Sequence, residues 1–97
     1  MTVNELKNKL NLIPVVEADY SREINGIYTG DLLSFVMSRA KKDNLWVTIM
    51  SSVNVAAVAS LTDVAAVLIA DNVVPSSELI KKSQEHGINI LATEKTA

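Results

Sequence analysis

The feature that most constrains the fold is residues 64–70, an unbroken run of alanine, valine, leucine and isoleucine. A strand that is covered on both faces by helices has no polar alternation, because neither of its faces meets water. This run is the most uniformly apolar stretch of the chain. It predicts the central strand of a parallel sheet.

Further strand and helix patterns surround this run in alternating order. Residues 12–17, 45–50 and 88–92 are typical of strands, whereas residues 54–61 carry alanine and valine at helical density. Strands alternating with helices predict right-handed βαβ crossovers. We therefore expect one layered α/β domain over residues 1–97, with a core of about 2–94 and a mainly parallel sheet of about four strands flanked by helices.

The ends of several elements are marked by residues with defined backbone roles. Thr2, followed three residues later by Glu5, predicts a capped helix start, and Ser76 predicts another. Gly87 predicts a helix end, since glycine tolerates the left-handed conformation. Pro14 cannot donate to a ladder, so its strand is expected at an edge of the sheet or at a strand start.

Residues 26–34, with the sequence Gly-Ile-Tyr-Thr-Gly-Asp-Leu-Leu-Ser, form a turn-like run that opens onto a helix over residues 32–40. Gly30 is expected to free the backbone there, and Asp31 to cap the first helical turn. Arg22 and Asp31 are expected to form a salt bridge between the preceding loop and the helix start. The apolar stripe of this helix consists of Leu32, Leu33, Val36, Met37 and Ala40.

The run 26–34 and the five residues before it resemble the DRTGG domain family, and the resemblance extends over about residues 1–94. Arg22, Gly26, Asp31, Leu32 and Leu33 fit the family pattern, while Ser21 and Asn25 depart from it. The resemblance implies the fold of the amino-terminal, non-catalytic domain of HPr kinase. Related modules lie between CBS domains in regulated pyrophosphatases. It thus implies a regulatory module without kinase activity.

Composition excludes several classes of function. The 97 residues include no cysteine, which removes disulfides and thiolate chemistry and fits a cytoplasmic protein. The net charge is −2 with acidic and basic residues intermixed, so we expect no nucleic-acid binding. The longest apolar-rich stretch, 53–70, is interrupted by polar residues, and the first five residues lack a signal-peptide pattern. We expect no membrane association.

Polar residues follow the predicted strands, and in open α/β sheets ligands bind beyond the carboxyl ends of the strands. Backbone N–H groups at the start of the helix after the signature would suit an anion. These residues predict a site for a small anionic ligand or nucleotide, although the same residue types also cap helices and face water. The candidate ligand-binding residues are Tyr28, Thr29, Gly30, Asp31, Ser51, Ser52, Asn54, Asp71, Asn72 and Thr93.

The sequence contains no recognisable catalytic or cofactor motif. The glycines at 26 and 30 match neither the phosphate-loop pattern nor the dinucleotide fingerprint. His86, the single histidine, lies at a predicted helix end, and no cluster of metal ligands accompanies it. We expect no catalytic residue, no metal and no cofactor. The alternative is a small-molecule enzyme or transferase at the same edge, with Asp31 and Asp71 as acid or base.

Self-association is expected because almost half of the residues are hydrophobic in a small domain. A symmetric homodimer is the commonest outcome, with a protein partner in a signalling or metabolic system as a further expectation. Trp46, at the start of a predicted strand, is expected in the core or at an interface rather than at a ligand, and is the residue to examine at a dimer contact. The chain ends soon after Thr93, so the adjoining edge of the sheet is expected to be open for pairing.

Overall fold

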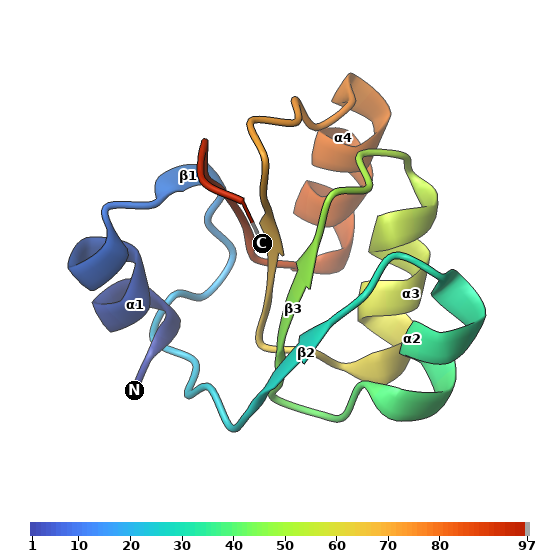
Figure 1. Ribbon diagram of the computed structural model, residues 1–97, viewed down its shortest axis with the longest axis horizontal. Helices are drawn as coiled ribbons and strands as arrows, with labels where there is room; N and C mark the ends of the chain where they lie inside the picture. The colour runs from blue at the N-terminus through green and yellow to red at the C-terminus, as the bar shows by residue number, and fades with distance from the viewer. Residues whose placement is uncertain (97) are drawn as a thin grey trace.

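The computed structural model describes residues 1–96, and its sheet has the strand order β1-β5-β4-β3-β2 (Figure 1). The pairs β2–β3, β3–β4 and β4–β5 are parallel, and β1–β5 is antiparallel. In chain order the elements are α1 (Val3–Leu10), β1 (Ile13–Val16), β2 (Ile27–Thr29), α2 (Leu33–Arg39), β3 (Leu45–Thr48), α3 (Asn54–Thr62), β4 (Ala66–Ile69), α4 (Ser77–His86) and β5 (Ile90–Ala92).

The predicted α/β class is confirmed, and the expected number of strands was one too low for the described residues. The additional strand is β2, which comes from the run that the sequence presented as a turn. It has only three residues and lies between Gly26 and Gly30, so it shows no extended strand pattern. Its parallel register with β3 makes it an edge of the sheet.

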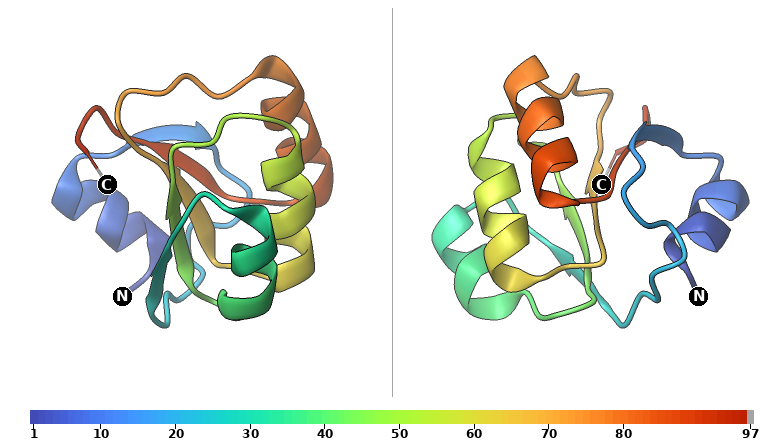
Figure 2. Two further views of the ribbon diagram at one scale, coloured as in Figure 1. Left: turned by 45° about the vertical axis from the view of Figure 1, so that its right-hand side comes forward. Right: turned by 180° about the vertical axis from the view of Figure 1, so that it is seen from behind.

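Helices cover the two faces of the sheet unequally. α2, α3 and α4 lie together on one face, while α1 and the chain that follows β1 lie on the other (Figures 1 and 2). The side chains accordingly form two apolar clusters, one that contains Trp46, Val55 and Leu79 and one that contains Val3, Tyr20 and Leu91. β4 lies between these clusters with all four of its residues buried, which confirms its predicted central place.

The predicted helix ends are confirmed in atomic detail. Thr2 and Glu5 form a reciprocal capping box at α1, and Ser76 Oγ accepts a hydrogen bond from Leu79 N at 3.1 Å. Gly87 ends α4 in the left-handed conformation, with φ of 68°. These signals involve residues within one helical turn of each other, so local sequence is sufficient to specify them.

Several predictions about exposure were wrong. β5 is an interior strand because β1 pairs with it, so the edge beside Thr93 is not open. Trp46 is fully buried, and its Nε1 donates to Gly30 O at 2.9 Å, so of its two expected places, core and interface, it occupies the core. In α2, Val36 and Ala40 are buried as expected, whereas Leu32 and Met37 are exposed.

Pro14 lies in the antiparallel edge strand β1, as predicted, and the pairing of β1 with β5 is irregular between Pro14 and Val16. The backbone carbonyls of Thr93 and Lys95, which follow β5, accept hydrogen bonds from the turn after β4. Ala97 lies outside the described residues. No helix among residues 1–96 has the length and apolar character required to cross a membrane.

Candidate functional site

The carboxyl ends of β2, β3, β4 and β5 lie at the same edge of the sheet, because these four strands are parallel. The predicted site residues lie at or beyond the carboxyl ends of these strands, with Tyr28 and Thr29 still within β2, and they fall into three groups. One group follows β2, one lies between β3 and α3, and one lies where the turn after β4 meets the end of β5.

The group after β2 is held to β3 by side chains. Asp31 Oδ1 accepts hydrogen bonds from Thr48 Oγ1 at 2.7 Å and from Ile49 N at 2.9 Å. Asp31 is therefore not the cap of α2: the N-cap is Leu32, which makes no side-chain capping bond. The Asp31 carboxylate instead fixes the end of β2 against the end of β3.

Gly30 was expected to free the backbone, but among the glycines only Gly26 and Gly87 have a positive φ. Its role is steric. A Cβ at position 30 would lie 3.0 Å from Cε2 of the Tyr28 ring, closer than ordinary contact. Tyr28 packs against the core cluster on the helix-covered face, and Thr29, the next residue, points to the opposite face. These two side chains therefore do not share a site.

The predicted salt bridge between Arg22 and Asp31 is also wrong. Arg22 NH2 lies 2.8 Å from Asp43 Oδ1 and 2.9 Å from Asp63 Oδ1. Asp43 and Asp63 lie in the loops before β3 and β4. These loops are at the amino ends of the strands, on the side of the sheet opposite to the candidate site. Partial burial opposes the charge on Arg22, but the hydrogen bonds to Asp43 and Asp63 outweigh it and raise the pKa of Arg22. Arg22 thus holds the fold together away from the candidate site.

The group after β4 is a tight turn tied to the end of the chain. Asp71 and Asn72 both have left-handed backbone conformations, with φ of 63° and 57°. Asp71 N donates to Lys95 O at 2.7 Å, and Asn72 N donates to Thr93 O at 3.0 Å. Aspartate and asparagine tolerate this conformation better than other non-glycine residues. The left-handed backbone of this turn therefore accounts for an aspartate and an asparagine at positions 71 and 72, and both side chains are exposed.

The group between β3 and α3 lies where two helices begin. α3 has no side-chain cap and no acidic residue in its first turn. Ser76 N donates to Ser51 O at 3.1 Å, which places the capped start of α4 beside the start of α3. Ser52 and Asn54 are exposed next to this point. The N–H groups of Val55 and Ala56 already donate to Ser52 O at 3.1 Å and to Val53 O at 3.0 Å, so the helix dipole and the exposed hydroxyl and amide groups are what favour an anion at such a place.

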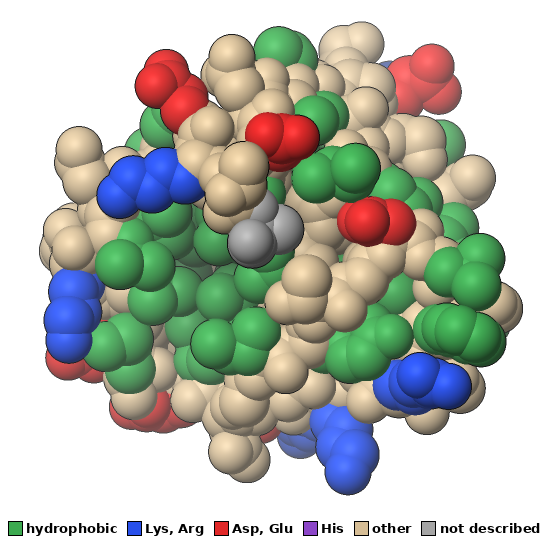
Figure 3. Space-filling model, viewed as in Figure 1, with side chains coloured by type: hydrophobic (Ala, Val, Ile, Leu, Met, Phe, Trp, Pro, Cys, Tyr) green, Lys and Arg blue, Asp and Glu red, His purple; other side chains and the backbone are tan. Residues whose placement is uncertain are grey.

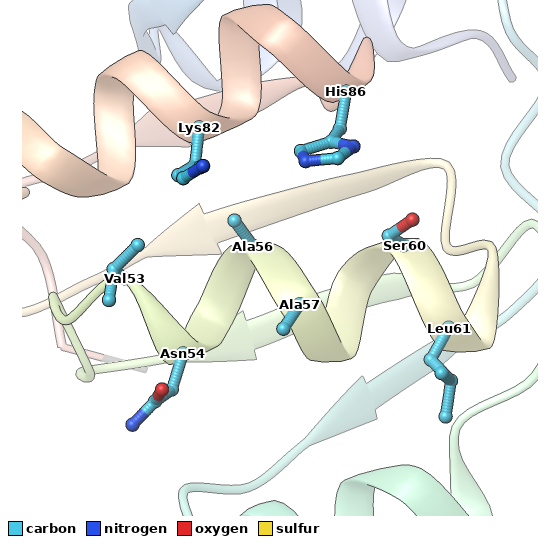
Figure 4. Close-up of a pocket in the computed structure, with 8 residues that line it drawn as sticks. All are labelled: Val53, Asn54, Ala56, Ala57, Ser60, Leu61, Lys82 and His86. Carbon is cyan, nitrogen blue, oxygen red and sulfur yellow. The ribbon is translucent and has the colours of Figure 1, made fainter.

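A groove between α3 and α4 was not predicted from the sequence. It has a volume of about 520 Å³. Figure 4 shows Lys82 and His86 pointing from α4 toward α3, above the small side chains of Ala56 and Ser60. The pairs Ala56/Ser60 and Lys82/His86 both have the i, i+4 spacing that shares a helix face, which is the signal that could have revealed the groove. No group of three or more potential metal ligands occurs among residues 1–96.

No family model and no curated protein matches the chain in sequence. In fold it is similar to the crystal structure of the CBS and DRTGG domains of the regulatory region of Clostridium perfringens pyrophosphatase, complexed with its activator diadenosine tetraphosphate. The TM-score is 0.79 at 10% identity, over 99% of this chain and 42% of that one. The chain therefore corresponds to less than half of that regulatory region, and the likeness establishes the fold.

Proposed function

We propose that this chain is a non-catalytic regulatory domain that binds a small anionic ligand of the nucleotide class and acts through self-association and a partner protein. The observation that carries the proposal is the likeness in fold, over nearly the whole chain, to a regulatory region crystallised with a nucleotide activator. The same likeness accords with the DRTGG resemblance of residues 1–94. A cytoplasmic location is part of the proposal.

The proposed ligand site is the point where α3 and α4 begin, formed by Ser51, Ser52 and Asn54. Hydroxyl and amide groups there lie at the positive end of the α3 dipole, where no side chain caps the helix. The other candidate residues supply no cation, and Asp31 and Asp71 carry negative charge. Affinity would therefore come from the helix dipole and from hydroxyl and amide groups at the helix starts rather than from an ion pair.

The enzyme alternative, with Asp31 and Asp71 as acid and base, gains no support from the geometry. One oxygen of Asp31 already accepts two hydrogen bonds that hold β2 to β3. Asp71 follows β4, and β3 lies between β2 and β4, so the two carboxylates are separated by two strand spacings, on the order of 10 Å. Neither residue has a hydrogen-bonded histidine, lysine or cysteine among the described residues that would complete a catalytic pair.

The test is thermal unfolding with diadenosine tetraphosphate, ATP, inorganic phosphate and adenosine. A ligand at a hundred times its dissociation constant adds about 2.7 kcal/mol of stability. In a domain of this size that raises the melting temperature by on the order of 10 °C. We expect the phosphorylated compounds to stabilise the protein and adenosine not to.

The variant Asn54→Asp separates a specific site from general charge effects. It is isosteric and places a carboxylate in the first turn of α3, which the helix dipole favours, so the fold should persist while the anion is repelled. Asn4→Asp is the matched control, because Asn4 is also an exposed residue in a first helical turn. Equal loss of the ligand effect in both variants, or no shift with any compound, would contradict the proposed site.

A further inference from the structure

The two edges of the sheet differ in how they are protected against pairing. The β1 edge contains Pro14 and an irregular register between Pro14 and Val16, two devices that block addition of a further strand. The β2 edge has neither: residues 24–30 contain no proline and no charged residue, and the three β2–β3 pairs are regular. The β2 edge is therefore an uninterrupted template for another strand.

The hydrogen bonds that attach β2 to β3 define which backbone groups remain free. Leu45 N donates to Gly26 O at 2.9 Å, and Gly30 N donates to Val47 O at 3.1 Å. Tyr28 lies opposite Trp46, so in a parallel ladder the N–H and C=O of Tyr28 face β3. The N–H and C=O groups of Ile27 and Thr29 consequently point away from the sheet.

Apolar side chains flank these free groups. Ile27 is 67% exposed in β2, and Leu32 and Phe35 are 57% and 46% exposed at and after the start of α2. Leu32 and Phe35 are three residues apart and so share one side of α2, whereas Met37 lies on the side that meets α3 near Ala57. Figure 3 shows hydrophobic side chains gathered over β2 and α2. In β2, Ile27 shares the face of Thr29, opposite Tyr28 and α2, so apolar side chains flank the free edge on both faces of the sheet. We name the free edge of β2, together with Ile27, Leu32 and Phe35, the β2 edge surface.

We propose that the β2 edge surface binds the β2 edge surface of a second copy of this chain, with the two β2 strands antiparallel about a twofold axis. An antiparallel pair of identical strands is self-complementary, which is what a twofold dimer requires. Ile27 and Thr29 of one copy would exchange backbone hydrogen bonds with Thr29 and Ile27 of the other. Tyr28 would then face Tyr28 of the second copy at the axis, in the closely spaced, non-hydrogen-bonded position.

Charge favours the same occupant. An antiparallel arrangement of the two α2 helices opposes their dipoles and brings the end that carries Asp31 toward the end that carries Arg39. Arg39 lies over the Phe35 ring at 4.3 Å, so it belongs to the same flank of α2. This inference rests on the self-association proposed above and assigns it to a surface.

The first experiment measures mass in solution by light scattering over micromolar to millimolar chain concentrations. The wild-type protein should have twice the 10.5 kDa chain mass. Ile27→Lys and Phe35→Lys place charges on the β2 edge surface and should give monomers that remain folded, because both side chains are already exposed. Ile13→Lys and Met37→Lys are the matched controls, at 50% and 51% exposure on the other edge and the other flank of α2, and should remain dimeric.

The second experiment uses the absence of cysteine. Tyr28→Cys places one thiol per chain at the proposed axis, where the expected Cα separation of about 4.5 Å permits a disulfide. Mild oxidation should give a covalent dimer with Tyr28→Cys and none with Ile13→Cys.

A monomeric wild-type protein would overturn both self-association and the β2 edge dimer, and would leave this edge to a strand from a different protein. A dimer that survives Ile27→Lys and Phe35→Lys and does not crosslink through position 28 would overturn the assignment of the surface alone. Ligand binding is measured separately, so its failure would leave this result unaffected.

Discussion

Ser83 is the clearest point at which a single substitution should stabilise the fold. It lies in α4, is fully buried, and its Oγ is the one buried side-chain nitrogen or oxygen atom within residues 1–96 that has no hydrogen-bond partner. A buried hydroxyl loses its bonds to water on folding, and here nothing replaces them. We predict that Ser83→Ala raises the free energy of unfolding.

The magnitude follows from three contributions. An unsatisfied buried hydroxyl costs about 1–3 kcal/mol. Alanine is better than serine in a helix interior by about 0.5 kcal/mol. The void left by one oxygen, roughly 10–15 Å³, costs about 0.3 kcal/mol. The net gain should be about 1–3 kcal/mol, and each kcal/mol should raise the melting temperature by about 4–8 °C.

Urea unfolding of Ser83→Ala and of a matched variant, Ser38→Ala, measures this gain. Ser38 lies in α2, is exposed, and its Oγ donates to Ser34 O and Phe35 O, both at 3.2 Å. Its substitution should change stability by less than about 0.5 kcal/mol, since helix propensity improves while weak bonds are lost. An equal gain in both variants would attribute the effect to propensity. A loss of stability in Ser83→Ala would refute the reasoning, because it would mean that the hydroxyl has a partner.

Two further predictions concern Tyr20 and Arg22. Burial, with a smaller effect from the nearby carboxylate of Glu17, raises the pKa of Tyr20 to about 12. Because the folded pKa lies above the unfolded value of about 10, the wild-type protein should keep the stabilisation from the neutral Tyr20 below pH 10 and lose up to about 3 kcal/mol between pH 10 and 12. In urea unfolding at each pH, Tyr20→Phe should lack that loss. A double-mutant cycle between a neutral substitution of Arg22 and Asp43→Asn should give a coupling free energy of about 1 kcal/mol, because partial solvent exposure weakens the ion pair. The same cycle with Asp31→Asn should give no coupling. A measurable coupling to Asp31 would contradict the geometry, which places no salt bridge between Arg22 and Asp31.

The fold was predictable from sequence wherever the signal was local or strong. The capping box at Thr2, the helix end at Gly87 and the buried strand β4 each depend on residues within a few positions, and each was predicted. β2 was missed because an edge strand of three residues between glycines has no periodicity to detect. Its strand geometry comes from pairing with β3, which is a tertiary interaction.

The candidate site was less predictable, for the same reason. The partners of Arg22 are 21 and 41 residues away, and those of Asp31 are 17 and 18 residues away. The types of these residues indicated hydrogen bonding, but the choice of partner depends on strand order, which the sequence did not specify. The order of elements did predict which residues would follow the parallel strands, and the structure groups them along one edge without assembling them into one cavity.

The contacts of Asp31 join the two proposed surfaces. Asp31 follows β2, which forms the proposed dimer edge, and its carboxylate binds Thr48 and Ile49 just before the loop with Ser51 and Ser52. The hydroxyl of Thr48 is buried and also accepts from Met50 N at 3.2 Å, so the path from β2 to that loop is a continuous chain of hydrogen bonds. If a ligand at the start of α3 changes the dimer dissociation constant, dimerisation must change the ligand affinity by the same factor. Asp31→Asn should reduce that factor while leaving the ligand site and the free backbone groups of β2 intact, because the substituted amide would keep an oxygen that accepts from Ile49 N but would lose the charge that strengthens both bonds. Loss of the same charge should also weaken the dimer itself, so the factor is compared within the variant, with and without ligand.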